Sequence, residues 1–444
     1  MPPEAEVRSP LVGRADELDS LSREVGLVGV SGDGLSRPQG AAVLLGGDAG
    51  LGKTRLLLEL RNRAVGAGWR VAVGHCLDFG DSALPYLPFS ELFGSIARDE
   101  PAVADALIAA QPALARLMPG HRMIDAADRG STDATTSDGA DRLGRGDLID
   151  AVHAALSQLA EERPLLVLVE DIHWADQSTR DLLTMLFTRP PAGPVAIVAS
   201  YRTDDLHRRH PLRATAAEWA RLPQISRMTL RPLSSKEVRT LVRALHPGPI
   251  PEMEVRRIVA RAEGNAFFTE ELVAAAGDGG RMIPTDLADL LLVRLDRLDD
   301  TTRQIVRAAA VAGRRVSHDL LAAVVGDDTD FDATLRPAVD ANILLPVRDG
   351  YAFRHALLAE AVYGDLLPGE RVRWHTAYVA ALSAPGAIAT AAELAGHARA
   401  AHDLPVALRA SIQAGDEAMS VGGPDEAAAH YEAALEILAL DPTT

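Results

Sequence analysis

One short stretch constrains the fold more than any other, because it needs a buried strand before it and a helix after it. Residues 47–54 read Gly-Asp-Ala-Gly-Leu-Gly-Lys-Thr and fit the pattern G-x-x-x-x-G-K-[ST]. A continuous apolar run over 41–45 precedes the pattern and predicts a strand buried on both faces. Helical periodicity follows over 54–65, and further apolar runs at 70–73, 165–169 and 195–200 alternate with helical segments. The chain therefore predicts an α/β fold with a parallel sheet.

The composition of this loop predicts phosphate binding. Glycines let consecutive backbone N–H groups point at phosphate oxygens, and the following helix adds a partial positive charge at its N-terminus. Lys53 would reach the β- and γ-phosphates of a nucleotide, and the Thr54 hydroxyl would bind Mg²⁺. Only Lys53 and Lys236 are lysines among 45 basic residues, so Lys53 stands out against a strong bias toward arginine. The expected nucleotide contacts from this segment are Gly47, Asp48, Ala49, Gly50, Leu51, Gly52, Lys53, Thr54 and Arg55.

Two further strands end in charged residues. The run 165–169 ends in Glu170 and Asp171, a pairing in which one acid holds the water shell of Mg²⁺ and the other polarises the attacking water. By position Glu170 is the metal-side acid and Asp171 the water-side acid, and this order stays open because Asp usually comes first. The run 195–200 leads to Arg202, which we expect at the nucleotide crevice beside a γ-phosphate, because the carboxyl ends of parallel strands line it. A solvated arginine is the equal alternative.

The composition excludes several classes of protein. A hydrophobic fraction of 47% and a charged fraction of 24% are typical of soluble globular chains. The longest aliphatic run, 165–169, is far shorter than the ~20 residues of a membrane helix. With a single cysteine and no signal peptide, we expect a cytoplasmic protein without membrane contacts. The net charge of −17 argues against DNA binding by these residues, since phosphate neutralisation needs clustered Lys and Arg.

Six segments with recognisable motifs follow one another along the chain. They are LVGR at 11–14, GGDAGLGKT at 46–54, LLVLVEDIHWAD at 165–176, SYRTDD at 200–205, GNAFF at 264–268 and FRHALL at 353–358. Together they resemble the ATPase region of the signal-transduction ATPases with numerous domains (STAND). The closest resemblance is to the large ATP-binding regulators of the LuxR type, common in actinobacteria and related to the bacterial maltose regulator. It spans residues 11 to about 440.

The resemblance implies a P-loop ATPase followed by a helical lid, a winged helix and TPR-like helical repeats. The expected parts are an N-terminal segment with the VGR motif at 1–40, the ATPase domain at 41–203, the lid at 204–284, the winged helix at 285–365 and the start of the repeats at 366–444. The residues themselves give an Asp-Gly hairpin signal at 349–350 and a helix pair at 408–421 and 426–440. The polar stretch 121–146 predicts a mobile loop or insertion.

The resemblance also implies further nucleotide contacts, with ATP or ADP and Mg²⁺ as cofactors. Val12, Gly13 and Arg14 would flank the adenine, Gly264 and Asn265 would close the lid over the base, and His355 would contact the phosphates. Ala266 stands where the family usually has proline, a difference that loosens the expected lid contact.

The expected function is a nucleotide-controlled switch in a transcriptional regulator, with weak ATPase activity resetting it. An unidentified inducer and self-assembly are the expected means of control, and DNA would be reached only through a C-terminal module outside these residues. Three alternatives stay open. The same ATPase region can serve another output such as a nucleotide cyclase or kinase, it can be a plain ATP hydrolase, or it can be a scaffold with a structural nucleotide.

Overall fold

The described part of the chain forms two compact units. The computed structural model describes residues 11–27, 41–77, 84–118, 145–207, 210–246, 248, 250–276, 292, 295, 297–326, 330–387 and 389–440. One unit holds the described residues up to Thr269 together with 418–425, and the other holds the rest. The loop predicted over 121–146 lies outside the described residues except for its last two positions. Within the described ranges, no helix has both the length and the apolar character to cross a membrane.

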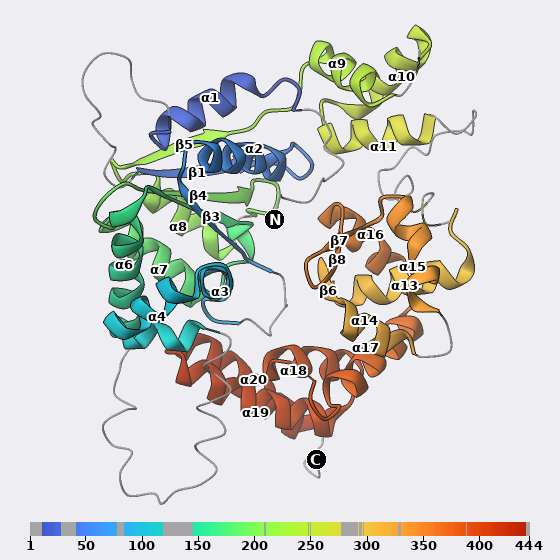
Figure 1. The fold of residues 1–444 in the computed structure, drawn as a ribbon. Coiled ribbons are helices and arrows are strands. Elements are labelled where there is room, and N and C mark those ends of the chain that lie inside the picture. The colour runs from blue at the N-terminus through green and yellow to red at the C-terminus, as the bar shows by residue number, and fades with distance from the viewer. Residues whose placement is uncertain are drawn as a thin grey trace, which may run out of the picture. The chain divides into compact units, whose positions relative to one another are not determined.

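A parallel sheet forms the centre of the first unit (Figure 1). Its strand order is β2-β3-β4-β1-β5, and every neighbouring pair runs parallel. The strands are β1 (Ala41–Gly47), β2 (Arg70–His75), β3 (Leu165–Glu170), β4 (Val195–Arg202) and β5 (Ile225–Thr229). The first four are the strands that the apolar runs predict, so the expected parallel α/β fold is confirmed.

Helices cover both faces of this sheet, because successive residues of a strand point to opposite sides. Val43 and Leu45 pack with α1 and α2 on one face, while Leu44 packs on the other face with the remaining helices (Figure 1). The helices of the sheet unit are α1 (Ala15–Glu24), α2 (Lys53–Gly66), α3 (Leu87–Asp99), α4 (Pro101–Ala110), α6 (Arg145–Glu162), α7 (Gln177–Thr188) and α8 (Pro211–Trp219), with short 3-10 helices η1 (Pro112–Leu117) and η2 (Ile172–Trp174).

Strand β5 differs from the sequence expectation. We expect residues 204–284 to be a helical lid, yet β5 lies within them and pairs with β1 through five residues from Ala42 to Gly46. Its sequence, Ile-Ser-Arg-Met-Thr, has no apolar run, and only its first residue is buried. An edge strand needs no such run, since it pairs on one side only. The sheet therefore continues beyond residue 203.

Three helices follow β5. They are α9 (Ser235–Leu245), α10 (Glu252–Ala262) and α11 (Ala266–Ala276). A capping box begins α9, in which the Ser234 side chain accepts from the N–H of Glu237 and the Glu237 carboxylate accepts from the N–H of Ser234. This turn lies against the entry segment of the chain, since a Cβ added at Gly13 would lie 2.7 Å from the Glu237 carboxyl group.

The second unit contains a small antiparallel sheet with the order β6-β8-β7. The hairpin expected at Asp349-Gly350 joins β7 to β8. The elements are α13 (Asp300–Val311), β6 (Arg315–Ser317), α14 (His318–Val325), α15 (Phe331–Asp340), β7 (Leu344–Val347), β8 (Gly350–Phe353), α16 (Ala356–Asp365), α17 (Pro368–Leu382), α18 (Ala391–Ala400), α19 (Leu404–Ser420) and α20 (Pro424–Leu440). The winged-helix and TPR assignments of these elements stay predictions.

Gly74 of β2 offers a test of how closely helix α3 approaches the sheet. A Cβ added at Gly74 would lie 2.1 Å from the backbone oxygen of Pro88 in α3. We expect Gly74→Ala to lower the free energy of unfolding by about 1–3 kcal/mol, because overpacking forces backbone shifts. The matched control is Gly66→Ala at the end of α2, where an added Cβ meets nothing within 4 Å. Thermal unfolding of both variants measures the difference, and equal midpoints would contradict this packing.

Candidate functional site

Strand register brings the charged groups expected at the site together at the carboxyl ends of the strands. In the pairing of β1 with β4, Gly47 lies opposite Arg202. In the pairing of β2 with β3, His75 lies opposite Glu170. The carboxyl ends of these four parallel strands therefore gather the glycine-rich loop, the acidic strand end and the arginine, as expected for a ligand crevice in an open α/β sheet.

The loop has the backbone conformation that its glycines permit. Gly50 and Gly52 have φ angles of 78° and 92°, in the left-handed region that favours glycine. Gly52 lies immediately before α2, so the N-terminus of that helix faces the loop. Arg55, the third residue of α2, pairs with Glu59 at 3.1 Å, and its contact with a nucleotide stays a prediction.

Lys53 is buried against the loop that it follows. Its Nζ donates to the carbonyl oxygens of Gly47 at 2.6 Å and Asp48 at 2.9 Å. Burial lowers the pKa of Lys53 from its ordinary value, while the nearby carboxylate of Asp171 raises it. The ammonium group is thus held against the first residues of the loop with little water around it. A bound phosphate would supply the negative charge and the hydrogen-bond acceptors that water does not provide there.

Two residues beyond Arg202 contact the loop directly. The Asp204 carboxylate accepts from the N–H of Ala49 at 3.2 Å, and the Thr203 hydroxyl donates to the Asp48 carboxylate. Neither residue was among the predicted nucleotide contacts. The segment SYRTDD gave a signal, because it follows a buried strand, but the pairing of β4 with β1 was needed to see what it contacts.

Glu170 lies at the end of β3 with its carboxylate largely buried. Within the described residues its Oε2 atom has no hydrogen-bond partner, and its Oε1 lies 4.0 Å from Nε2 of His75. Glu91 of α3 orients that histidine. Its carboxylate accepts from the backbone N–H of His75 at 2.9 Å and lies 2.9 Å from the ring Nδ1. His75 and Glu91 were also missed, since the predicted strand stopped at residue 73.

A divalent ion fits this donor set. A buried carboxylate oxygen without a partner is costly, and a hydrated cation would satisfy it. Mg²⁺ at nucleotide sites is typically bound through one or two carboxylates together with substrate phosphates. Glu170 and Asp171 would hold the ion with Thr54, which is exposed at the first turn of α2. The ion would supply charge neutralisation at the phosphates.

Asp171 follows Glu170 in a left-handed conformation, with φ 59° and ψ 43°. Its N–H donates to the Ser200 hydroxyl at 3.2 Å, which ties the turn after β3 to strand β4. At Asp171 the backbone therefore leaves the extended conformation of β3, which ends at Glu170. The two acids thus occupy different surroundings, one buried and one half-buried, as different roles require.

Arg202 is buried at the end of β4 and lies against His173. The N–H of Arg202 donates to Nδ1 of His173 at 3.4 Å. Burial lowers the pKa of His173 to about 3, so its imidazole is neutral at neutral pH. Arg202 is therefore positioned by a fixed ring and is not solvated, contrary to the alternative that the sequence left open.

The entry segment contacts the loop through Arg14. This buried arginine donates to the carbonyl oxygens of Leu51 at 3.2 Å and Arg231 at 2.6 Å, and it pairs with Glu17 at 2.9 Å. Gly13 has a φ of 68°, and a Cβ there would lie 2.7 Å from the Glu237 carboxyl group at the start of α9. Val12, two residues before Arg14, is half-buried. The contact of this motif with adenine stays a prediction, while its contacts join the loop to the lid.

Asn265 contacts the loop from the other end of the lid. Its Nδ2 donates to the carbonyl oxygen of Ala49 at 2.9 Å, and its Oδ1 accepts from the N–H of Phe268 at 3.0 Å in the first turn of α11. The N–H of Phe267 donates to the carbonyl oxygen of Gly50 at 3.1 Å. Gly264 has a φ of 81°, and a Cβ there would lie 2.4 Å from the Leu233 oxygen. Its closure over a base stays a prediction.

His355 belongs to the second unit. It precedes α16, and its Nε2 lies 3.7 Å from the Glu270 carboxylate, which also pairs with Arg354 at 3.4 Å. These contacts are the surroundings that the structure gives this side chain. Its contact with nucleotide phosphates stays a prediction.

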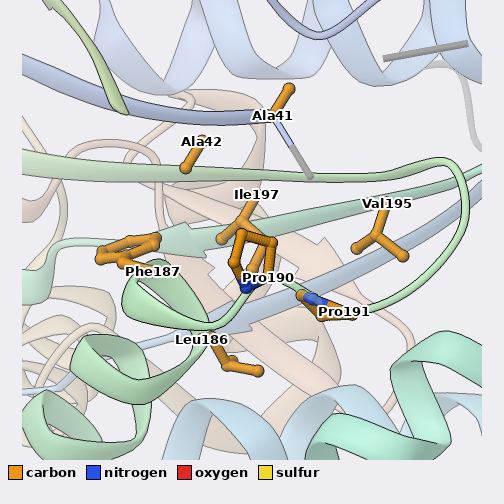
Figure 2. Close-up of a pocket in the computed structure, with 8 residues that line it drawn as sticks. All are labelled: Ala41, Ala42, Leu186, Phe187, Pro190, Pro191, Val195 and Ile197. Atoms are coloured by element: carbon orange, nitrogen blue, oxygen red, sulfur yellow. The ribbon is translucent and has the colours of Figure 1, made fainter. Parts of the chain in front are cut away.

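A small hollow at the amino ends of β1 and β4 does not suit a nucleotide. Figure 2 shows it beside the first residues of β1 and β4, where Ala41 and Val195 lie. Its lining consists of Ala41, Ala42, Leu186, Phe187, Pro190, Pro191, Val195 and Ile197. None of these side chains carries a charge or a hydrogen-bonding group that would hold a phosphate.

The dual role of Asn265 can be separated by substitution. We expect Asn265→Ala to remove both the loop contact and the helix cap, and Asn265→Asp to keep the cap but lose the donor to Ala49. Hydrogen exchange of the loop amides should become about fivefold faster in both variants, as for loss of one hydrogen bond worth ~1 kcal/mol. Exchange of the Phe268 amide should rise in the Ala variant alone. Unchanged loop exchange in both variants would contradict the docking of Asn265 on the loop.

Comparison with known proteins agrees with this geometry. Residues 10–198 match the family of AAA ATPase domains. An uncharacterized protein of Rhizobium meliloti (strain 1021) is 29% identical over 470 residues, which cover 96% of this chain and 43% of the relative. The chain thus spans less than half the length of that relative.

One solved structure is similar over almost the whole chain. It is a signal transduction ATPase with numerous domains (STAND) protein with a tetratricopeptide repeat sensor, from Pyrococcus horikoshii. The TM-score is 0.55 at 13% identity, and the similarity covers 99% of this chain and 59% of that protein. At this identity the similarity shows the fold. Residues 10–198 therefore carry an AAA ATPase domain, in a chain whose fold is similar to that of a STAND ATPase.

Proposed function

We propose that this chain is the ATP-binding switch of a LuxR-type transcriptional regulator. ATP and Mg²⁺ bind at the loop of residues 47–55, slow hydrolysis to ADP resets the switch, and an inducer acts on the helical part. The state with ATP favours assembly or output, and the state with ADP is the resting state. DNA is reached through a module outside these residues, since a chain with net charge −17 is a poor phosphate-binding surface.

The observation that carries this proposal is the docking of the lid on the loop. Asn265 and Phe267 donate to the carbonyl oxygens of Ala49 and Gly50, the same peptide segment whose N–H groups would bind phosphates. A ligand that fills the loop fixes those peptides and therefore changes the partners available to the lid. Such a direct link between ligand and a neighbouring element is what a two-state switch requires. A plain hydrolase has no need of it.

Two observations support the regulatory context. The six ordered motifs resemble the LuxR-type regulators, and the α19–α20 hairpin has the small and large residues of a tetratricopeptide unit, with Gly415 packed against the Tyr431 ring. The Pyrococcus protein is named for a repeat sensor of this kind. We infer that the helical part of this chain senses the inducer, and that another output, such as a cyclase or kinase, is the rival assignment.

Lys53 provides the direct test of nucleotide binding. We expect Lys53→Ala to weaken ATP binding at least about tenfold, roughly 1.4 kcal/mol, because a charge-assisted contact to the phosphates is lost. Isothermal titration calorimetry measures the change. The other lysine supplies the control, since Lys236 is exposed in the first turn of α9 and Lys236→Ala should bind ATP as the wild type does. Equal affinity of the two variants would refute the phosphate-binding assignment.

The acidic pair tests the roles of Glu170 and Asp171. Asp171→Asn should keep ATP binding and suppress hydrolysis, because a water-polarising carboxylate is lost. Glu170→Gln should weaken the dependence of binding on Mg²⁺, because the buried oxygen that would face the ion is replaced. Titrations with and without Mg²⁺ and steady-state phosphate release measure both effects, and exchanged phenotypes would invert the two roles. Wild-type turnover also separates the alternatives, being slow for a switch, fast for a hydrolase and absent for a scaffold.

A further inference from the structure

A buried histidine links Arg202 to a neighbouring carboxylate that the nucleotide assignment does not use. The side chain of His173 has an exposed fraction of 0%. Its Nδ1 accepts from the backbone N–H of Arg202 at 3.4 Å, so the neutral ring carries its proton on Nε2. That Nε2 lies 3.4 Å from Oδ2 of Asp205. The protonated nitrogen of the imidazole therefore lies near the carboxylate without a well-aligned hydrogen bond to it.

Asp205 lies between this ring and the guanidinium group of Arg202. Its Oδ2 is 3.7 Å from Nη1 of Arg202, three residues earlier in the chain. Neither this oxygen nor Nε2 of His173 has a hydrogen bond of good geometry to any described residue. Burial raises the pKa of Asp205 above its ordinary value, and the charge of Arg202 opposes that rise.

Arg202 also lies next to the phosphate-binding loop. It is opposite Gly47 in the sheet. Burial lowers the pKa of Lys53, and the nearby charge of Arg202 adds to that lowering. A third phosphate bound at the loop would approach the same guanidinium group that Asp205 faces. Two anions would then compete for one cation, whereas a diphosphate leaves the existing pair in place.

We propose that Asp205 is a residue that determines nucleotide specificity, acting as the resting counter-ion of Arg202 beside His173 and displaced by the γ-phosphate. The inference rests on the proposed nucleotide function and adds the group against which ATP competes. Breaking the Arg202–Asp205 pair opposes the binding of ATP and leaves the binding of ADP unaffected.

The test is Asp205→Asn in the full chain. The amide keeps the shape of the side chain and an oxygen for His173 but loses the charge that pairs with Arg202. Titrations with Mg²⁺ and either ADP or the slowly hydrolysed analogue adenosine 5′-(β,γ-imido)triphosphate give both affinities. We expect the affinity for the triphosphate to rise about two- to fivefold, the worth of a partly exposed ion pair, with the affinity for ADP unchanged.

Three further variants isolate the cause. In an Arg202→Gln background, Asp205→Asn should have no effect, because the cation that the two anions share is gone. His173→Leu should raise selectivity for the triphosphate as Asp205→Asn does, since it removes the polar ring that lies 3.4 Å from the carboxylate. Asp150→Asn is the matched charge control, because Asp150 pairs with Arg189 on the exposed surface and should change neither affinity.

The outcomes separate this inference from the proposed function. If the wild type binds neither nucleotide, the proposed function is wrong and the inference falls with it. If the wild type binds nucleotide but Asp205→Asn strengthens ADP equally, or weakens the triphosphate, only the role of Asp205 is wrong. A gain that persists in the Arg202→Gln background would show a general charge effect instead and would also overturn it.

Discussion

The first unit depends on the pairing of the backbone carbonyl groups in the loop between β1 and α2. A strand that leads into a helix through glycines in left-handed conformations leaves peptide groups that no helix or sheet can satisfy. Here Lys53 takes the oxygens of Gly47 and Asp48, while Asn265 and the N–H of Phe267 take those of Ala49 and Gly50. Arg14 takes the oxygen of Leu51. The loop is therefore held by segments from three parts of the chain.

Two features of this pairing require glycine at residue 50. Its φ of 78° favours glycine, and an added Cβ would also lie 2.5 Å from Oδ1 of Asn265. The missing side chain at residue 50 thus allows Asn265 to approach the loop closely. The carboxylate of Asp204 accepts from the N–H of Ala49, and the carboxylates of Asp204 and Asp48 both lie near the charge of Lys53.

Local patterns in the sequence predicted the central strands and the loop, because both leave strong signals over a few residues. Strand β5 was missed because an edge strand needs no apolar run, and the strand ends at His75 and Arg202 were placed two residues short. Arg14 and Asn265 were singled out from the resemblance, but their partners depend on pairings across the chain that no local pattern contains. His173 lies within the motif at 165–176 without a predicted role, and only its burial beside Arg202 indicated one.

The contacts of the loop also set the order in which the site can form during synthesis. The hydrogen bonds from Arg14 to Arg231 and from Asn265 to Ala49 join residues 217 and 216 positions apart. The loop leaves the ribosome early, yet its last carbonyl partners arrive only when residues beyond 260 have been made. Because β1 pairs with β4 and β5, the loop gains a sheet beside it only after residue 202 is made, and its carbonyl partners beyond residue 260 follow later still. A chaperone or an early-bound nucleotide would find that loop accessible before the lid does.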